Sequence, residues 1–166
     1  MDGKHQVLQE YFGYDTFRPG QGELIDALLS GRDAFGVMPT GGGKSLCYQV
    51  PALLLPGVTV VVSPLISLMR DQVLALKKAG VGAAYLNSSL TQPQMDQVCR
   101  RLLAVEYRLL YVAPERLLAD RFLSVVRQLD VAMVAVDEAH CISQWGNCRT
   151  MNKIRRKAIR CRRQAS

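Results

Sequence analysis

Three glycines followed by a lysine and a serine carry the clearest chemical signal in the sequence: Gly41 to Gly43, then Lys44 and Ser45. Glycines allow positive φ and bring backbone N–H groups against an anion, with no Cβ in the way. Lys44 can reach the β and γ phosphates of a nucleotide, and the Ser45 hydroxyl can hold Mg²⁺. The pattern predicts a phosphate-binding loop, although Met38 stands where the usual motif has its first glycine. The alternative is a plain glycine-rich turn between a strand and a helix.

A second signal is the acidic pair Asp137 and Glu138, which follows the apolar run Val131 to Val136. Asp137 would orient Mg²⁺ opposite Ser45, and Glu138 would activate or position the attacking water, because phosphoryl transfer needs placement and charge neutralisation. An acid pair after a strand is by itself most often a solvated loop. Together with the phosphate loop, it indicates a nucleotide-hydrolysing site.

A third group precedes the loop and combines an aromatic ring, a planar cation and an amide. Tyr14 could stack on an adenine base, Arg18 could pack over it, and Gln21 could donate and accept hydrogen bonds at its edge. The alternative is that Phe12 and Phe17 are core residues and that Arg18 begins a turn. We favour the core interpretation for the two phenylalanines and the adenine interpretation for Gln21.

The elements that must position these groups alternate along the chain. Helical spacing of apolar residues covers 5–11, 24–29, 65–78 and 93–105, and the helix after the loop is expected to end at Pro51 and Pro56. Apolar runs predict strands at 33–38, 58–63, 83–86, 108–112 and 131–136. Unbroken β-branched runs are typical of parallel strands covered on both faces. We therefore predict an α/β fold with a mainly parallel sheet flanked by helices.

Polar residues follow two of these strands. Asn87, Ser88 and Ser89 come after 83–86, and a turn at 113–116 comes after 108–112. Ligands gather at the carboxyl edge of an open α/β sheet, so these residues could contribute to a site. Capping of the next helix explains the Asn and Ser residues equally well.

The net charge of +7 is unevenly distributed. Residues 147–166 hold eight of the 21 Lys and Arg residues and none of the 14 acids, which leaves 13 basic and 14 acidic residues in 1–146. The basic character therefore belongs to the last segment and is not evidence about the rest of the chain.

Five cysteines, an odd number without a C-x-x-C pair, favour reduced thiols over disulfides and provide no zinc-site spacing. No apolar run is long enough to span a membrane, and the N-terminus shows no export leader. We expect a soluble, cytoplasmic protein.

The order of the motifs resembles the RecQ-type DNA helicases of helicase superfamily 2. The resemblance covers nearly all of residues 5–146. It rests on Phe12-Gly-Tyr-Asp-Thr-Phe-Arg-Pro-Gly-Gln21, on 38–53, on 60–73 with Ser-Pro-Leu-Ile-Ser-Leu-Met-Arg70, on Tyr111-Val-Ala-Pro-Glu-Arg-Leu117 and on Val136-Asp-Glu-Ala-His-Cys-Ile-Ser-Gln-Trp-Gly146.

The resemblance implies a RecA-like domain that uses ATP and Mg²⁺ and moves 3′ to 5′ on single-stranded DNA, opening duplexes in repair and recombination at the nucleoid. Adenine would be bound by Tyr14, Arg18 and Gln21. The phosphates and the metal would be held by Thr40, Gly41, Gly42, Gly43, Lys44, Ser45 and Asp137, with Lys44, Asp137 and Glu138 as catalytic residues. Ser63, Arg70 and Arg116 would face the DNA backbone, and His140, Gln144 and Trp145 would couple DNA binding to hydrolysis, with Trp145 as a buried anchor in the alternative interpretation.

After Gly146 the sequence departs from the family pattern. The family continues with a segment of the His-Asp-Phe-Arg-Pro type, whereas this chain continues with the basic residues 147–166. We expect residues 1–146 to be a partial ATP-binding domain and 147–166 to come from a frameshifted or truncated coding sequence, with a genuine nucleic-acid-binding arm as the alternative. In helicases of this kind, the strand after the acidic pair lies inside the sheet, between the phosphate-loop strand and the strand that ends at the acidic pair. Loss of that strand would leave unpaired backbone groups at about 1 to 3 kcal/mol each. We therefore expect poor or rearranged folding in isolation and no unwinding.

Two other functions remain open from the sequence. One is a small-molecule kinase or another phosphate-loop enzyme, against which Gln21 and the Asp137-Glu138-Ala-His sequence argue. The other is a non-enzymatic nucleic-acid binder that acts through residues 149–163.

Overall fold

The computed structural model describes residues 2–39, 41–117 and 119–138. The chain forms two compact units, Met1–Pro56 and Gly57–Ser166. The structure is an α/β fold with a parallel sheet, which confirms the fold class predicted from the sequence.

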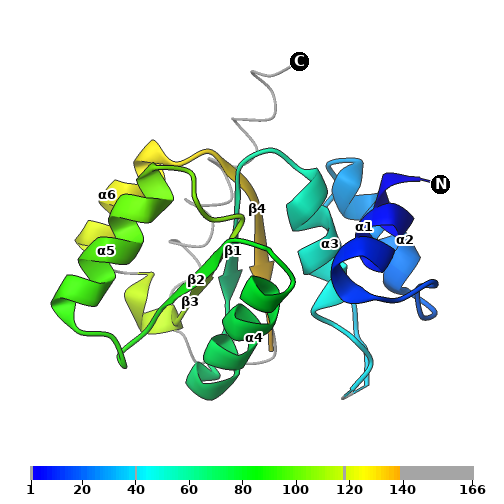
Figure 1. Cartoon of the computed structure of the whole chain (residues 1–166), viewed down its shortest axis with the longest axis horizontal. Helices are drawn as coiled ribbons and strands as arrows, with labels where there is room; N and C mark the ends of the chain where they lie inside the picture. The colour runs from blue at the N-terminus through cyan, green and yellow to red at the C-terminus, as the bar shows by residue number, and fades with distance from the viewer. Residues whose placement is uncertain (1, 40, 118, 139–166) are drawn as a thin grey trace. The chain divides into compact units, whose positions relative to one another are not determined.

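The first unit contains α1 (Gly3–Phe12), α2 (Gln21–Leu29) and α3 (Leu46–Leu54), drawn from blue to cyan in Figure 1. Their inward faces contribute Val7, Leu8, Ile25 and Val50 to one buried cluster. Helix α2 ends in a left-handed turn, where the Arg32 N–H donates to the Ala27 carbonyl at 2.9 Å. The helix predicted at 24–29 is confirmed, and it starts at Gln21, three residues earlier than predicted.

The strand predicted at 33–38 is wrong. Residues 32–39 have no regular secondary structure, and the side chains of Phe35 and Val37 are 80% and 85% exposed. The apolar pattern suits a strand, but a strand also needs a neighbour that completes its backbone hydrogen bonds. Within the described part of this unit, no other strand is present to provide one.

Pro51 lies inside α3 instead of ending it, which corrects a second prediction. The helix continues to Leu54, and the Leu55 N–H donates to the Pro51 carbonyl at 2.8 Å. Proline removes one helical hydrogen bond. The fully buried Val50 and Ala52 on either side hold the helix by packing.

The second unit contains β1 (Val58–Val62), β2 (Ala83–Leu86), β3 (Leu109–Val112) and β4 (Val131–Val136). In the described residues these form one parallel sheet in the order β2-β3-β1-β4. Every one of these strands lies where the sequence predicts it, to within one residue at each end. Buried β-branched residues on both faces explain why the signal is strong: all five residues of β1 are buried.

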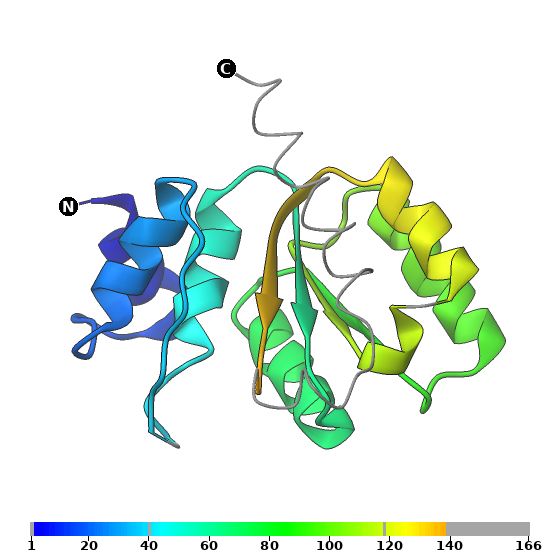
Figure 2. The same ribbon diagram turned by 180° about the vertical axis from the view of Figure 1, so that it is seen from behind.

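Helices α4 (Ile66–Lys78), α5 (Gln92–Leu103) and α6 (Asp120–Gln128) connect these strands, with a short 3₁₀ helix, η1 (Pro114–Arg116), after β3. The chain crosses the sheet in one direction from β1 to β2 and returns from β2 to β3, so right-handed crossovers require α4 and α5 on opposite faces. Figures 1 and 2 show this arrangement, with α5 and α6 together on one face.

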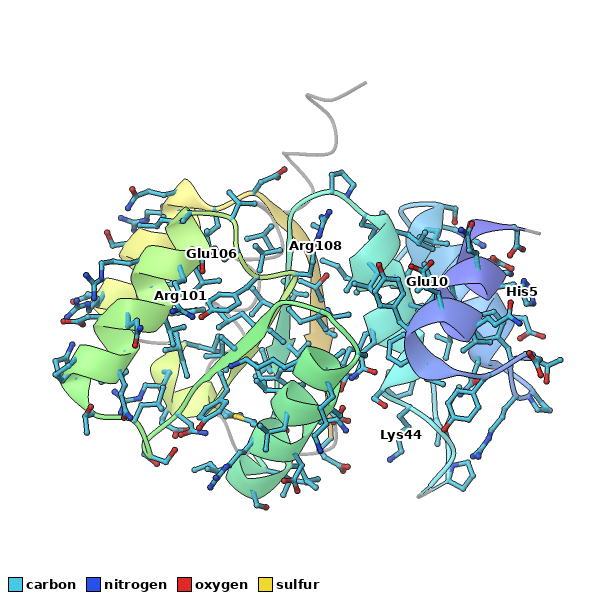
Figure 3. All side chains as sticks on the ribbon, in the orientation of Figure 1. His5, Glu10, Lys44, Arg101, Glu106 and Arg108 are labelled. Carbon is cyan, nitrogen blue, oxygen red and sulfur yellow. The ribbon has the colours of Figure 1, made fainter. Side chains whose placement is uncertain are left out.

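Helix α5 ends in a strained turn. Val105 has φ of +59°, a left-handed conformation that β-branched residues rarely adopt. Its N–H donates to the Leu102 carbonyl at 3.0 Å, and the N–H of Glu106 donates to the Arg101 carbonyl at 3.1 Å. The side chains of Arg101 and Glu106, both labelled in Figure 3, also form an exposed ion pair across this turn.

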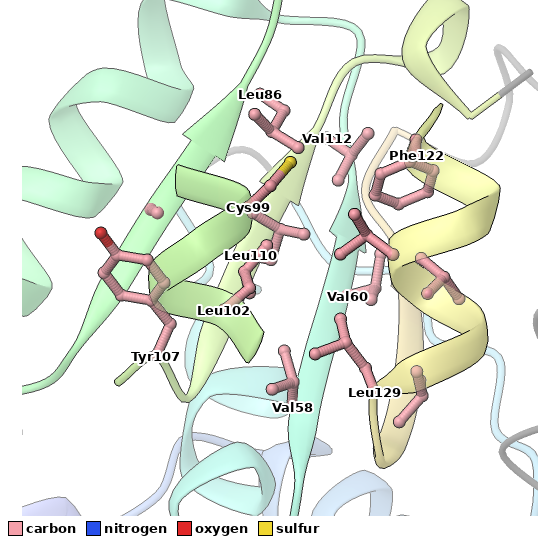
Figure 4. Packing of buried hydrophobic residues seen from close by; sticks show 14 of the residues in the cluster. Val58, Val60, Leu86, Cys99, Leu102, Tyr107, Leu110, Val112, Phe122 and Leu129 are labelled. Carbon is pink, nitrogen blue, oxygen red and sulfur yellow. The ribbon is translucent and has the colours of Figure 1, made fainter. Parts of the chain in front are cut away.

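The larger core lies between the sheet and the α5–α6 face (Figure 4). Val58, Val60 and Val62 alternate along β1 toward this face, where Leu102 of α5 and Phe122 of α6 meet them. The core thus fixes the strands whose carboxyl ends carry the acidic pair.

Candidate nucleotide-binding loop and sheet edge

The predicted phosphate loop lies in the first unit and leads directly into α3. The Gly42 N–H donates to the Pro39 carbonyl at 2.9 Å, and the Leu46 N–H donates to the Gly43 carbonyl at 3.2 Å. The loop is therefore a tight turn followed by a 3₁₀-type start to the helix. Figure 3 shows Lys44 at this turn.

Two of the glycines lie where a side chain would clash or be strained. A Cβ on Gly42 would lie 2.8 Å from the Pro39 carbonyl oxygen. Gly43 has φ of +74°, and a Cβ there would lie 2.6 Å from the Gln21 Nε2. Close backbone approach thus explains the glycine run that the sequence shows.

Ser45 is the N-cap of α3, but its side chain makes no capping hydrogen bond to the helix. The hydroxyl predicted to hold Mg²⁺ is therefore not used by the helix end. An N-terminal helix end also favours negative charge through its backbone N–H groups.

Gln21 lies against this loop and is 1% exposed. Its Nε2 donates to the carbonyls of Gly43 at 3.0 Å and Gly42 at 3.3 Å, while its Oε1 accepts from the Arg18 N–H at 2.9 Å. The Arg18 Nη1 donates to the Gly41 carbonyl at 2.6 Å. The structure therefore brings Arg18 and Gln21 to the phosphate loop, a contact that the sequence analysis did not foresee.

The adenine roles of Tyr14, Arg18 and Gln21 stay predictions. Tyr14 is 53% exposed, as a ring that stacks on a ligand could be. The turn interpretation for Arg18 also holds, because the Gln21 N–H donates to the Arg18 carbonyl at 3.1 Å. Phe12 and Phe17 pack against the core of the first unit, which confirms the core interpretation for both.

In the second unit, the carboxyl ends of the four described strands lie in one row. The Ser63 N–H donates to the Val112 carbonyl at 3.2 Å, and the Ala113 N–H donates to the Leu86 carbonyl at 3.0 Å. The Asp137 N–H donates to the Val62 carbonyl at 2.9 Å. Because the strands are parallel and in register, the predicted polar residues Ser63, Asn87, Arg116 and Asp137 follow neighbouring strand ends. This edge is where open α/β sheets bind ligands.

The acidic pair lies in a bend directly after β4. Glu138 has φ of +54°, and its N–H donates to the Asp137 Oδ1 at 3.0 Å. A left-handed conformation is costly for a residue other than glycine, by roughly 1 to 3 kcal/mol, and such strain often occurs at functional sites. Nothing in the sequence pattern predicted it.

The residues predicted to face DNA have different environments. Ser63 is buried and its Oγ accepts from the Leu65 N–H at 3.3 Å, whereas Arg70 is exposed on α4. The Nε of Arg116 is buried and, among the described residues, has no hydrogen-bond partner. Their assignment to DNA stays a prediction.

Asn87 does not cap α5, so that alternative is wrong. Thr91 is the N-cap and forms a capping box with Gln94. The buried Asn87 instead accepts from the N–H and the hydroxyl of Ser89, at 2.9 and 2.5 Å. It therefore shapes the turn at the carboxyl end of β2.

Several predicted residues lie outside the described part of the chain. These are Thr40, His140, Gln144 and Trp145, together with the basic segment 147–166. Within the described residues, no cluster of three or more His, Cys, Asp or Glu side chains could hold a metal ion, and none of the helices has the length and apolarity to cross a membrane.

Comparison with known proteins places these features in a family. Residues 18–165 match the DEAD/DEAH box helicase family. The chain is 52% identical over 141 residues to the ATP-dependent DNA helicase RecQ of Haemophilus influenzae, covering 85% of this chain and 23% of that protein. It is 50% identical over 142 residues to RecQ of Bacillus subtilis, covering 85% of this chain and 24% of that protein. The chain thus spans about a quarter of the length of these relatives.

A solved structure supports the fold independently. The chain is similar to a hypothetical ATP-dependent RNA helicase from Sulfolobus tokodaii, with a TM-score of 0.69, 22% sequence identity, and coverage of 93% of this chain and 46% of that one. At this identity the similarity shows the fold alone.

Proposed function

The chain belongs to the DEAD/DEAH box helicases, and on that basis we propose that residues 1–146 are the ATP-binding part of a RecQ-type DNA helicase. The observation that carries this proposal is the glycine loop at the start of α3, whose carbonyls are bound by Arg18 and Gln21. The relatives that share about half of their aligned residues with this chain are named ATP-dependent DNA helicases.

ATP would bind with its phosphates at the loop. The N–H groups of the loop and of the first turn of α3 would surround the phosphates, and the Lys44 amine would neutralise the β and γ oxygens. Tyr14 would stack on the adenine ring and Arg18 would pack over it. Gln21 would reach the base edge when its amide turns from the loop carbonyls that it binds in this structure. Binding by backbone N–H groups explains why close-packed glycines are needed here.

Mg²⁺ fits the oxygen ligands that the chain offers. Mg²⁺ prefers hydroxyl, carboxylate and phosphate oxygens, and the Ser45 hydroxyl is not used in capping α3. Ser45 and Asp137 would hold the ion, which supplies charge neutralisation on the phosphates. Glu138 would position the attacking water.

DNA would lie at the carboxyl edge of the sheet. Arg70 is exposed there on α4, and Arg116 follows β3. Cationic side chains bind phosphates without sequence preference, so these contacts suit movement along a strand. His140, Gln144 and Trp145 would couple DNA binding to hydrolysis. In the whole protein, this would drive 3′ to 5′ unwinding of partly duplex DNA at the nucleoid.

Lys44 provides the direct test. We expect Lys44→Ala to weaken binding of Mg-ATP by roughly 10- to 100-fold, because it removes a charge-assisted contact with the phosphates. Isothermal titration calorimetry on the purified chain measures this. Lys77→Ala is the matched control, because Lys77 is an exposed lysine in the last turn of α4.

Equal affinity of the Lys44→Ala variant and the wild type for Mg-ATP would contradict the proposal. So would a wild-type chain that is folded by circular dichroism and binds no Mg-ATP.

A further inference from the structure

Three consecutive carbonyl groups of the phosphate loop are bound from one side. The Gly41 carbonyl accepts from the Arg18 guanidinium, and the Gly42 and Gly43 carbonyls accept from the Gln21 amide. All of these residues belong to the first unit. Arg18 and Gln21 also bind each other, since the Arg18 N–H donates to the Gln21 Oε1.

This arrangement determines the direction of the loop's N–H groups. A trans peptide bond is planar and holds its C=O and N–H on opposite sides, and no cis peptide bond occurs among the described residues. Carbonyls turned toward Arg18 and Gln21 therefore turn the N–H groups of Gly42, Gly43 and Lys44 the other way. The Gly42 N–H is used within the turn by the Pro39 carbonyl, whereas the peptide planes of the next two N–H groups turn these groups away from Arg18 and Gln21.

From these contacts we infer that Arg18 is a positioning residue of the phosphate loop, in addition to any contact with the base. Its guanidinium holds the Gly41 carbonyl, and this keeps the following peptide planes in the orientation that binds polyphosphate. The inference rests on the proposed function, because it concerns the same ATP site.

The geometry of the contact supports a positioning role. The Nη1 to oxygen distance of 2.6 Å is short for a hydrogen bond from a charged donor. Arg18 has five N–H donors in a rigid plane, so this one bond leaves other donors and the face of the guanidinium for a base. Arg18 can therefore act on the loop whatever base the nucleotide carries.

Binding of a ligand without a base distinguishes the two roles. The experiment measures the affinity of the chain for Mg-ATP and for magnesium tripolyphosphate by calorimetry, in the wild type, Arg18→Ala, Arg18→Lys and Tyr14→Ala. A positioning role requires Arg18→Ala to weaken tripolyphosphate binding by roughly 10- to 100-fold and to weaken ATP binding by at least as much. Arg18→Lys should recover part of the affinity for both ligands, because an ammonium can still donate to the Gly41 carbonyl. Tyr14→Ala should weaken ATP alone.

Arg127→Ala is the control for loss of charge, because Arg127 is exposed in the last turn of α6 in the second unit. Hydrogen exchange measured by mass spectrometry without ligand adds a second readout. Amides in 41–46 should exchange faster in Arg18→Ala than in Arg127→Ala, even if binding is too weak to quantify.

Two results would overturn the inference, and they differ from each other. If Arg18→Ala weakens ATP and leaves tripolyphosphate binding within twofold of the wild type, Arg18 acts on the base only and the proposed function still holds. If the folded wild type binds neither ligand, the proposed function fails and the inference fails with it.

Discussion

Replacement of Gln21 by glutamate tests the loop geometry most directly, because it changes one buried group and almost no volume. In the wild type the Gln21 Nε2 donates to two loop carbonyls, and Oε1 accepts from the Arg18 N–H. In Gln21→Glu the second oxygen is an acceptor that faces two other acceptors at 3.0 and 3.3 Å. The substitution therefore removes two hydrogen bonds and places a charge in a site that is 1% exposed.

The expected loss follows from these contacts. Two neutral hydrogen bonds contribute about 0.5 to 1.5 kcal/mol each, and the unpaired buried acceptors add to that. We expect a loss of about 2 to 4 kcal/mol in the free energy of unfolding at pH 7.5. In a chain of this size, each kcal/mol corresponds to about 2 to 4 °C in Tm.

The loss should depend on pH. Burial and the two carbonyl oxygens raise the pKa of the introduced carboxyl above its unfolded value of about 4.3. A protonated carboxyl can donate one hydrogen bond to the loop, so its stabilising contribution is fully present below the unfolded pKa and is lost as pH rises through the folded pKa. The difference from the wild type should therefore be small near pH 4 and grow toward neutral pH.

Urea unfolding followed by far-ultraviolet circular dichroism, at several pH values, measures this difference. Gln21→Met is the matched control, since it removes the same hydrogen bonds without a titratable group and should show a loss independent of pH. The reasoning is refuted if Gln21→Glu is within 0.5 kcal/mol of the wild type at pH 7.5, a threshold set by ordinary surface substitutions, or if its loss does not change with pH.

Two further predictions concern stability and thiol chemistry. Val105→Gly should raise the free energy of unfolding by about 0.5 to 1 kcal/mol in urea titrations. The substitution relieves left-handed backbone strain of about 1 to 2 kcal/mol at a residue that is 75% exposed. The greater entropy of glycine in the unfolded chain offsets part of this gain. Val105→Ala keeps the Cβ and should gain less, and a destabilised Val105→Gly would contradict the turn geometry. Burial raises the pKa of the Cys47 thiol to about 11, so iodoacetamide at pH 8 should modify Cys47 slowly in the folded chain and rapidly in urea. Mass spectrometry of the labelled peptides checks this, and fast labelling without urea would show that the start of α3 is open.

The sequence was most informative where one property alone decides the structure. The runs of valine at Val58–Val62 and Val131–Val136 predict buried parallel strands because their side chains are apolar on both faces. The glycine run was equally informative, because close backbone approach at Gly42 and Gly43 selects glycine at successive positions; its binding of phosphate stays a prediction. Family membership followed from the order of such motifs along the chain.

Prediction failed where contacts in the folded chain, and not residue type alone, decide the outcome. Residues 33–38 have the composition of a strand but lack a neighbouring strand in the described part of their unit. Pro51 is tolerated inside α3 because its neighbours are buried. Thr91, and not Asn87, caps α5, because the chain takes a turn at Ser89 before the helix begins.

The sequence by itself predicted the kind of site, since a lysine and a serine after glycines and an acid pair after an apolar strand are local residue types that suit phosphate chemistry. Only the tertiary structure decided how the loop is held. Arg18 and Gln21 reach the loop carbonyls across more than 20 positions of sequence, through the packing of α2 against α3. The left-handed conformation of Glu138, in the bend after β4, is likewise a feature that only the structure shows. Contacts of this kind depend on where folded elements place their side chains, and no spacing along the chain encodes them.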